Sequence, residues 1–148
     1  MKSLQLLLPI VACLVAKVYG KIFSRCELAS VLKQWGMDGR QGYGLGDWVC
    51  LAYFASTFNT ATVMHNADGT SEYGIFQLNS RSWCDDHHSQ SENFCSMSCS
   101  DLLTNDIEDD VICLQKATAK AGGLKTWNGW RDHCRGKNLS HWLAPCHL

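Results

Sequence analysis

The chain has 148 residues, and its 13 basic and 14 acidic residues give a formal net charge of −1 at pH 7. Removing residues 1–20, which contain two lysines and no acid, leaves 11 basic against 14 acidic residues, a formal charge of −3. This acidic balance offers no long-range attraction to nucleic acid or anionic cell walls, which excludes nucleic acid as an expected partner.

Residues 1–20 have the pattern of a secretory signal peptide. Lys2 supplies a positive charge, the stretch from Leu4 to Val15 is almost wholly apolar, and Gly20 is a small residue suited to cleavage. An apolar stretch of about a dozen residues is too short for a membrane-spanning helix, which needs roughly 20. We therefore expect a secreted protein without a membrane span, with one domain covering residues 21–148.

The cysteine content agrees with an exported protein. One of the nine cysteines, Cys13, lies in the predicted signal peptide, which leaves an even number. An even number in an exported domain predicts four disulfides and no free-thiol chemistry, but spacing alone allows 105 pairings. The eight cysteines are Cys26, Cys50, Cys84, Cys95, Cys99, Cys113, Cys134 and Cys146.

Two helices are predicted near the start of the domain. Ser24 and Glu27 form a capping-box pattern, and apolar residues then recur at helical spacing until Gly36. Asp47 precedes a second helical stretch, Trp48 to Phe58. Because this stretch is dense in apolar residues, we expect it to be largely buried.

From Thr60 to Asn79 the pattern favours short strands. Asp68-Gly69 is a tight-turn signal between Thr62-Val63 and Tyr73-Gly74-Ile75-Phe76, both of which favour β structure. The sequence therefore predicts a small sheet inserted between helical parts.

A third helix is predicted from Ile107 to Ala121. Val111, Ile112 and Leu114 are its apolar candidates, and the pair Gly122-Gly123 ends it. Helices with a segregated small sheet define an α+β fold class.

Four motifs follow one another along the domain: Arg25-Cys26-Glu27-Leu28-Ala29, Trp48-Val49-Cys50-Leu51-Ala52, Tyr73-Gly74-Ile75-Phe76-Gln77-Leu78-Asn79-Ser80 and Trp127-x-x-Trp130-Arg131. Together with the cysteine spacing, they resemble the c-type lysozyme and α-lactalbumin family over residues 21–148. The resemblance implies a lysozyme-like fold, with a helical lobe, a small antiparallel β lobe and a saccharide cleft between them. It also implies the disulfides Cys26–Cys146, Cys50–Cys134, Cys84–Cys99 and Cys95–Cys113.

Retaining glycosidases such as lysozyme need two carboxyl groups about 5 Å apart, one protonated and one ionised. The resemblance places the proton donor just before Ser56, where this chain has Ala55, and a methyl group cannot donate a proton. Glu72 occupies the second carboxylate position, where hydrolytic members usually have Asp. Without a partner, Glu72 is also consistent with a plain polar sheet residue. No sequence feature places another acid, such as Asp68, in the missing role.

Five further residues match sugar-contacting positions of the family and offer amide groups and aromatic faces. The alternative is that the tryptophans pack and the amides brace the sheet. The five are Asn66, Gln77, Asn79, Trp83 and Trp127.

Two departures from the family pattern predict reduced sugar affinity: Ser82 replaces a stacking aromatic residue, and Lys120 replaces a sugar-binding Asp. The other tryptophans considered, Trp35, Trp48 and Trp130, are expected in the core rather than at a ligand.

An acidic segment resembles the calcium-binding elbow of α-lactalbumin and calcium-binding lysozymes. Because Thr104 replaces the third carboxylate there, we expect weakened calcium binding; the alternative is that the acids only favour a helix N-terminus. No cofactor is required by the expected function, and Asp85-Asp86-His87-His88 lacks the ligand spacing of a zinc site. The candidate calcium residues are Asp101, Thr104, Asp106, Asp109 and Asp110.

Within the family, Gly42-Tyr43-Gly44, Gly46-Asp47-Trp48 and Lys137-Asn138-Leu139-Ser140-x-Trp142 are similar to sperm-acrosome lysozyme-like proteins. We expect a secreted or acrosomal monomer that binds an oligosaccharide or glycoprotein without hydrolysis, with a role in sperm–egg recognition. The alternatives are an active muramidase, a peptidoglycan hydrolase of antibacterial defence, and an α-lactalbumin-type modifier of a glycosyltransferase. Asn138 also begins an N-glycosylation sequon.

Overall fold

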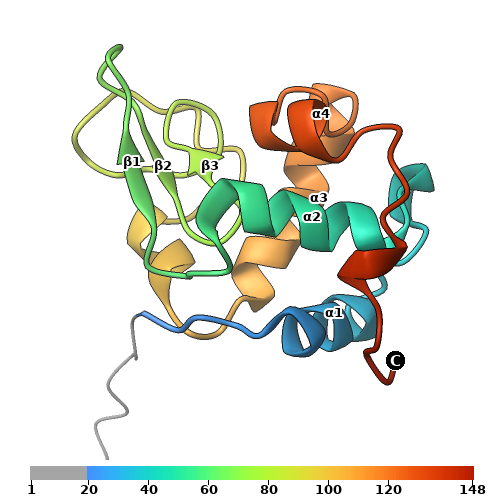
Figure 1. Ribbon diagram of the computed structural model, residues 1–148. Coiled ribbons are helices and arrows are strands. Elements are labelled where there is room, and N and C mark those ends of the chain that lie inside the picture. The colour runs from blue at the N-terminus through green and yellow to red at the C-terminus, as the bar shows by residue number, and fades with distance from the viewer. Residues whose placement is uncertain (1–19) are drawn as a thin grey trace, which may run out of the picture.

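The computed structural model describes residues 20–148, so the predicted signal peptide lies outside the described residues except for Gly20. Figure 1 shows helices on one side and a small sheet on the other, which confirms the α+β class. The elements are α1 (Arg25–Gln34), the 3₁₀ helix η1 (Arg40–Gly42), α2 (Leu45–Ser56), β1 (Val63–His65), β2 (Ser71–Tyr73), β3 (Leu78–Asn79), η2 (Cys99–Leu103), α3 (Glu108–Ala121), α4 (Asn128–His133) and η3 (Ser140–Trp142).

Helix α1 begins as the capping pattern predicts. The Ser24 hydroxyl accepts a hydrogen bond from the backbone N–H of Glu27 at 3.2 Å, which satisfies one free donor at the helix start. Leu28 and Leu32, one turn apart, are fully buried against the rest of the helical lobe. Trp35 follows the helix and is 39% exposed, so the expectation that it lies in the core is wrong.

Helix α2 begins three residues before the predicted start. Its first turn is held by the Asp47 carboxylate, which accepts from the backbone N–H of Gly44 at 3.1 Å. Asp47 therefore lies inside the first turn rather than before it. The helix ends before Thr57, whose backbone is left-handed with φ of 52°, two residues earlier than the sequence pattern predicts.

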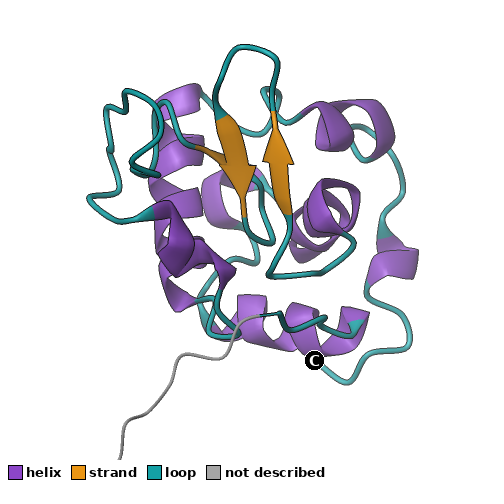
Figure 2. Cartoon of the chain, turned by 90° about the vertical axis from the view of Figure 1, so that its left-hand side faces the viewer, coloured by secondary structure: helices purple, strands orange, loops and turns teal. Residues whose placement is uncertain are grey.

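The sheet has the order β1-β2-β3, with both pairs antiparallel. Glu72, in the middle of β2, pairs with Met64 on β1 and with Asn79 on β3, so these three side chains form one row on the same face. The turn between β1 and β2 is held by Asp68, whose carboxylate accepts from the backbone N–H of Thr70 at 3.0 Å. Figure 2 shows this hairpin extending beyond the helices that surround it.

The segment after β2 is a turn and not the strand predicted from Gly74, Ile75 and Phe76. Ile75 and Phe76 are apolar because they are fully buried in the main core, not because they alternate along a strand. Gly74 has φ of +82°, and a Cβ at this position would lie 2.5 Å from the carbonyl oxygen of Leu102. The close approach and the positive φ both require glycine.

The main core lies between the helices, and a second cluster lies beneath the sheet and against α3. Trp48 and Trp130 belong to the main core, as predicted. In α3, Val111 and Leu114 are fully buried, whereas Ile112 is 42% exposed and is not a core residue. The buried face of α3 therefore excludes one of its three apolar candidates.

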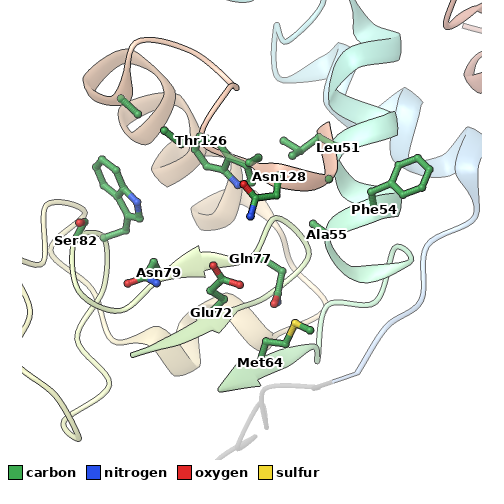
Figure 3. Close-up of a pocket in the computed structure, with 14 residues that line it drawn as sticks. Leu51, Phe54, Ala55, Met64, Glu72, Gln77, Asn79, Ser82, Thr126 and Asn128 are labelled. Atoms are coloured by element: carbon green, nitrogen blue, oxygen red, sulfur yellow. The ribbon is translucent and has the colours of Figure 1, made fainter. Parts of the chain in front are cut away.

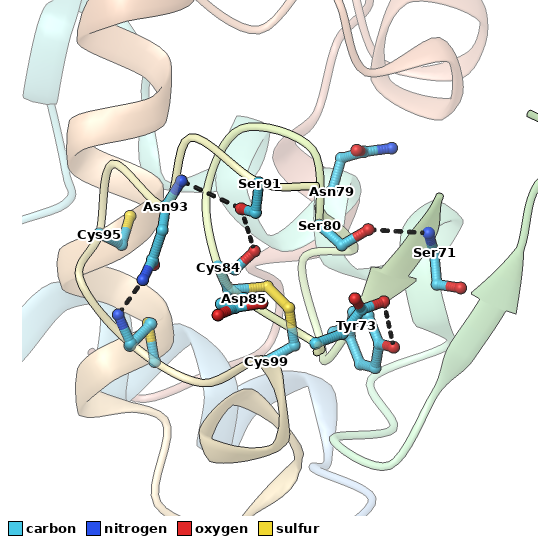
Figure 4. Close-up of a disulfide and its surroundings, with 12 residues drawn as sticks. Ser71, Tyr73, Asn79, Ser80, Cys84, Asp85, Ser91, Asn93, Cys95 and Cys99 are labelled. Carbon is cyan, nitrogen blue, oxygen red and sulfur yellow. Dashed lines mark hydrogen bonds between the residues drawn. A yellow bond between two sulfur atoms is a disulfide. The ribbon is translucent and has the colours of Figure 1, made fainter. Parts of the chain in front are cut away.

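Four disulfides connect distant parts of the chain, and they confirm the pairing implied by the resemblance. Two of them join the C-terminal segment to α1 and α2, and the other two join the loop after β3 to η2 and to α3; Figure 4 shows the Cys84–Cys99 bond and its surroundings. In residues 20–148, no helix has the length and apolarity required to cross a membrane. The pairs are Cys26–Cys146, Cys50–Cys134, Cys84–Cys99 and Cys95–Cys113.

Candidate functional site

A cleft of about 450 Å³ lies between the sheet and the helical lobe. Its walls come from the last turns of α2, from one face of the sheet, from the loop after β3 and from the segment that begins α4 (Figure 3). Polar and apolar side chains both contribute to it. The residues are Leu51, Phe54, Ala55, Met64, Glu72, Gln77, Asn79, Ser82, Trp83, Ala121, Thr126, Trp127, Asn128 and Gly129.

Ala55 lies in the last turn of α2 and contributes its methyl group to the cleft wall. The position is held by its neighbour Ser56, whose buried hydroxyl is 2.7 Å from the carbonyl oxygen of Ile75 and 3.0 Å from that of Ala52. These contacts attach the end of the helix to the turn beside the sheet. A carboxyl group on residue 55 would therefore project into the cleft, but the chain has none there.

Glu72 projects from β2 into the same cleft and is half-buried (Figure 3). Burial raises the pKa of its carboxyl group above the ordinary value, and the negative charge of Asp68 raises it further. Among the described residues that line the cleft, Glu72 alone carries a carboxyl group. The cleft can therefore place one titratable acid at a sugar, but not two.

Asp68, the other acid considered for the missing role, lies at the hairpin turn outside the cleft lining. Its carboxylate accepts from the hydroxyl and the backbone N–H of Thr70, at 2.6 and 3.0 Å, and its other oxygen is 3.4 Å from the Arg81 guanidinium. The hydrogen bonds from Thr70 lower the pKa of Asp68 more than the charge of Arg81 does. Because Asp68 stays ionised and lies outside the cleft lining, it is not suited to protonate a bound sugar.

Two of the five predicted sugar-contacting side chains donate their hydrogen bonds to backbone carbonyl oxygens of the protein itself. The Gln77 amide nitrogen donates to the carbonyl oxygens of Thr62 and Gly74, at 3.0 and 2.9 Å. The Trp127 indole N–H donates to the carbonyl oxygen of Phe76 at 3.0 Å. Both residues line the cleft, but their donors brace the turn after β2.

The remaining three predicted residues differ in position. Trp83 lines the cleft and lies 5.7 Å, centroid to centroid, from Phe94. Asn79 also lines the cleft, and its amide nitrogen is 3.3 Å from the Thr70 hydroxyl. Asn66 is not among the lining residues, because its amide donates to the same hydroxyl, at 3.1 Å, within the hairpin turn. The structure thus brings four of the five together at the cleft.

The sequence analysis missed the apolar part of the lining. Phe54 and Met64, from α2 and β1, line the cleft and are 39% and 57% exposed. The signal available in the sequence was weak: Met64 lies two residues from Asn66, at a spacing that would place both on one face of a strand. Nothing in the sequence pattern connected Phe54 to the same surface.

The acidic segment before and within α3 does not gather around one point. Asp110 is fully buried, and neither of its carboxyl oxygens has a hydrogen-bond partner among residues 20–148. Asp109 accepts from the Asp110 backbone N–H at 3.0 Å, and the Thr104 hydroxyl donates to the Asp106 carbonyl oxygen at 3.0 Å.

No three carboxylate, imidazole or thiol side chains in residues 20–148 are grouped so that they could hold a metal ion. The acidic segment thus does not gather three carboxylates around one point, and weakened calcium binding stays a prediction. In the second metal candidate, His87 and His88 are exposed, and the His87 ring nitrogen is 3.3 Å from Asp85.

Comparison with known proteins identifies the family. Residues 21–146 match the model of the C-type lysozyme/alpha-lactalbumin family. The chain is 49% identical over 135 residues to sperm acrosome-associated protein 5 of Homo sapiens, covering 91% of this chain and 85% of that protein. It is 47% identical over 137 residues to sperm acrosome membrane-associated protein 3 of Mus musculus, covering 93% of this chain but only 62% of that protein.

The fold is similar to solved structures as well. The crystal structure of recombinant canine milk lysozyme matches with a TM-score of 0.83 and 47% sequence identity, covering 86% of this chain and 100% of that one. Fold and sequence thus agree over the described residues. The chain is a member of the C-type lysozyme/alpha-lactalbumin family.

Proposed function

We propose that this protein binds glycans in its cleft without hydrolysing them. The observation that carries the proposal is Ala55, a methyl group in the cleft wall at the position of the family's catalytic acid. Removal of a positioned general acid typically lowers a rate by about 10² to 10⁴. The cleft keeps the shape for a sugar but lacks the proton donor.

Glu72 does not compensate for this loss. Its raised pKa suits a proton donor, but the cleft then contains no ionised carboxylate to stabilise the positive charge that develops on the sugar. If Glu72 is instead ionised, the proton donor is missing. One of the two roles stays empty in either protonation state.

The names of the relatives support a location for this protein. Two of the similar proteins are named for the sperm acrosome, and the sequence begins with a predicted signal peptide. We propose that the protein is secreted into the acrosomal vesicle and contacts oligosaccharides of a glycoprotein during sperm–egg recognition. The alternative, an active muramidase of antibacterial defence, rests on the similarity to lysozymes.

A hydrolysis assay on peptidoglycan, paired with glycan-binding measurements on the same preparation, tests the proposal. The unmodified protein should release no reducing ends above background, whereas Ala55→Glu should raise the rate by up to about 10² to 10⁴, the contribution of a general acid. Ala55→Gln is the matched control, because it adds a side chain of similar size that cannot supply the same proton.

Two results would contradict the proposal. The first is robust hydrolysis by the unmodified protein that is lost in Glu72→Gln, which would support the muramidase alternative. The second is the absence of any calorimetric heat with chitooligosaccharides at millimolar concentration, which would remove the glycan as a ligand.

A further inference from the structure

Glu72 lies between a polar half of the cleft, with Asn79, and a half that is mainly apolar, with Phe54, Ala55 and Met64. Gln77 also lies in the second half (Figure 3), but it is buried and its amide nitrogen donates to two backbone carbonyl oxygens; the second half is called the apolar half below. The sheet order places Met64 beside Glu72 on the β1 side and Asn79 beside it on the β3 side. Figure 3 shows Phe54 and Ala55 on the Met64 side of Glu72, and Asn79 on the opposite side. The two halves therefore contact different parts of any ligand that extends through the cleft.

The polar half is suited to a sugar chain. Trp83, whose backbone N–H donates to the carbonyl oxygen of Asn79 at 3.0 Å, contributes an aromatic ring there, and Asn79 and Glu72 contribute polar groups. Aromatic faces and amide or carboxylate groups are the usual contacts of pyranose rings and their hydroxyl groups. This part of the cleft corresponds to the glycan site proposed above.

The apolar half has exposed hydrophobic surface in a concave position. Met64 is 57% exposed and Phe54 is 39% exposed, although both are large hydrophobic side chains. One side of the Phe54 ring stacks on His133 at 4.2 Å between centroids, with an angle of 9° between the rings. Phe54 is among the cleft residues and retains exposed surface, so a ligand at this end of the cleft can cover part of it.

The chemistry of the site gives the direction of the ligand. In retaining glycosidases the acid protonates the oxygen of the leaving group, so the leaving group lies on the acid's side of the scissile bond. Ala55 stands at the acid's position, and Phe54 and Met64 lie on the same side of Glu72 as Ala55 does. The group attached to the reducing end of a bound sugar would thus enter the apolar half.

We infer that the cleft recognises an amphipathic glycoside, with its sugar units in the polar half and an apolar aglycone against Phe54, Ala55 and Met64. This rests on the proposed glycan-binding function and names its ligand class. The missing acid has a second consequence in this arrangement: the Ala55 methyl group leaves an uncharged surface where an acid would meet the aglycone. A glycolipid and a glycoside with an aromatic aglycone both have this chemistry.

Calorimetric titration with methyl, hexyl and phenyl β-chitotriosides tests the inference. The methyl glycoside measures the sugar alone, and the other two carry an alkyl or an aromatic aglycone. Each buried methylene strengthens binding roughly fourfold. If two or three of the five additional methylenes are buried, hexyl β-chitotrioside should bind roughly 15- to 60-fold more tightly than the methyl glycoside. A larger gain for hexyl than for phenyl would favour a lipid source, and the reverse an aromatic one.

Met64→Gln tests the position of the aglycone, because it keeps the length of an exposed side chain and replaces its apolar end. It should remove most of the hexyl gain and leave the affinity for the methyl glycoside within twofold. Val63→Gln is the matched control: Val63 is exposed on the same strand, points to the other face of the sheet and is not among the cleft residues. This variant should change neither affinity.

The outcomes separate the two proposals. If the methyl and hexyl glycosides bind equally, the amphipathic site is refuted while glycan binding stands. A hexyl gain that survives in Met64→Gln but disappears in Val63→Gln would also refute it, because the aglycone would then lie on the wrong face. If no chitotrioside binds, both proposals are refuted.

Discussion

The buried carboxyl group of Asp110 should make the protein less stable as the pH rises. Asp110 is fully buried, and within the described part of the chain neither carboxyl oxygen has a hydrogen-bond partner. Burial is the main cause that raises its pKa well above the ordinary value, and the nearby Asp109 raises it further. The native state therefore holds Asp110 in its neutral form at pH values where an exposed aspartate is ionised.

The sign of the effect follows from proton counting. Below the unfolded pKa, close to 3.8, both states bind the proton and pH has no effect through this group. Between that value and the raised native pKa, the native state binds one more proton than the unfolded state. The free energy of unfolding then falls as the pH rises, by up to about 1.4 kcal/mol per pH unit. This dependence disappears in Asp110→Asn.

Urea unfolding of the unmodified protein and of Asp110→Asn, at intervals from pH 4 to pH 7.5 in the presence of EDTA, measures this difference. The stability of the variant relative to the unmodified protein should increase with pH, by up to about 1.4 kcal/mol per unit, or about 5 °C in Tm for a domain of this size. The new amide changes the free energy of unfolding by an amount that does not depend on pH. The test is therefore the slope, against pH, of the difference in unfolding free energy between the variant and the unmodified protein. If the free energies of unfolding of the two proteins run parallel against pH, the reasoning is refuted. The control is Asp132→Asn, which removes an exposed carboxyl group.

Three further predictions concern the acidic segment and the cleft. Calcium at 1 mM should leave the Tm unchanged within 1 °C, and an increase of several degrees that is lost in Asp110→Asn would show that a calcium site forms. Ser56→Ala should lower the free energy of unfolding by roughly 1 to 3 kcal/mol, because the Ile75 carbonyl loses its buried hydroxyl partner. Thermal unfolding measures this loss, and a loss under about 0.3 kcal/mol would contradict the prediction. Asp68→Asn should lower the pKa of Glu72, although burial remains the larger cause; carboxyl NMR titration measures it, and an unchanged pKa would exclude the charge of Asp68 as a cause.

The sequence predicts those parts of the fold that local chemistry determines. Ser24 starts α1 because its hydroxyl accepts a nearby backbone N–H, a contact that needs no tertiary structure. The predicted element boundaries that were wrong depend on side chains that bond to an earlier part of the chain or that pack into the core. Asp47 holds a helix start three residues before itself, and Ile75 and Phe76 are apolar because a turn carries them into the core.

The candidate site was predictable where the family pattern has a fixed register, as at Ala55 and Glu72. It was not predictable where the cleft forms only when two lobes meet. Phe54 and Met64 come from α2 and β1, and no periodicity within either element indicates that they share a surface. The same limit applies to Asn66, which matches a sugar-contacting position but donates its amide within the hairpin turn.

Retention of a polar residue in this cleft is weak evidence for a ligand when that residue also supports the fold. Gln77 donates to two backbone carbonyl oxygens and Trp127 to a third, so both would be needed even in a protein that binds no sugar. Met64 supports nothing comparable, since it is more than half exposed and lies beside Glu72 in the row of side chains that faces the cleft. Substitutions that weaken binding without destabilising the protein should therefore be sought first at Glu72 for the sugar and at Met64 for an apolar aglycone. A loss of binding at Gln77 would not distinguish a lost contact from a distorted turn.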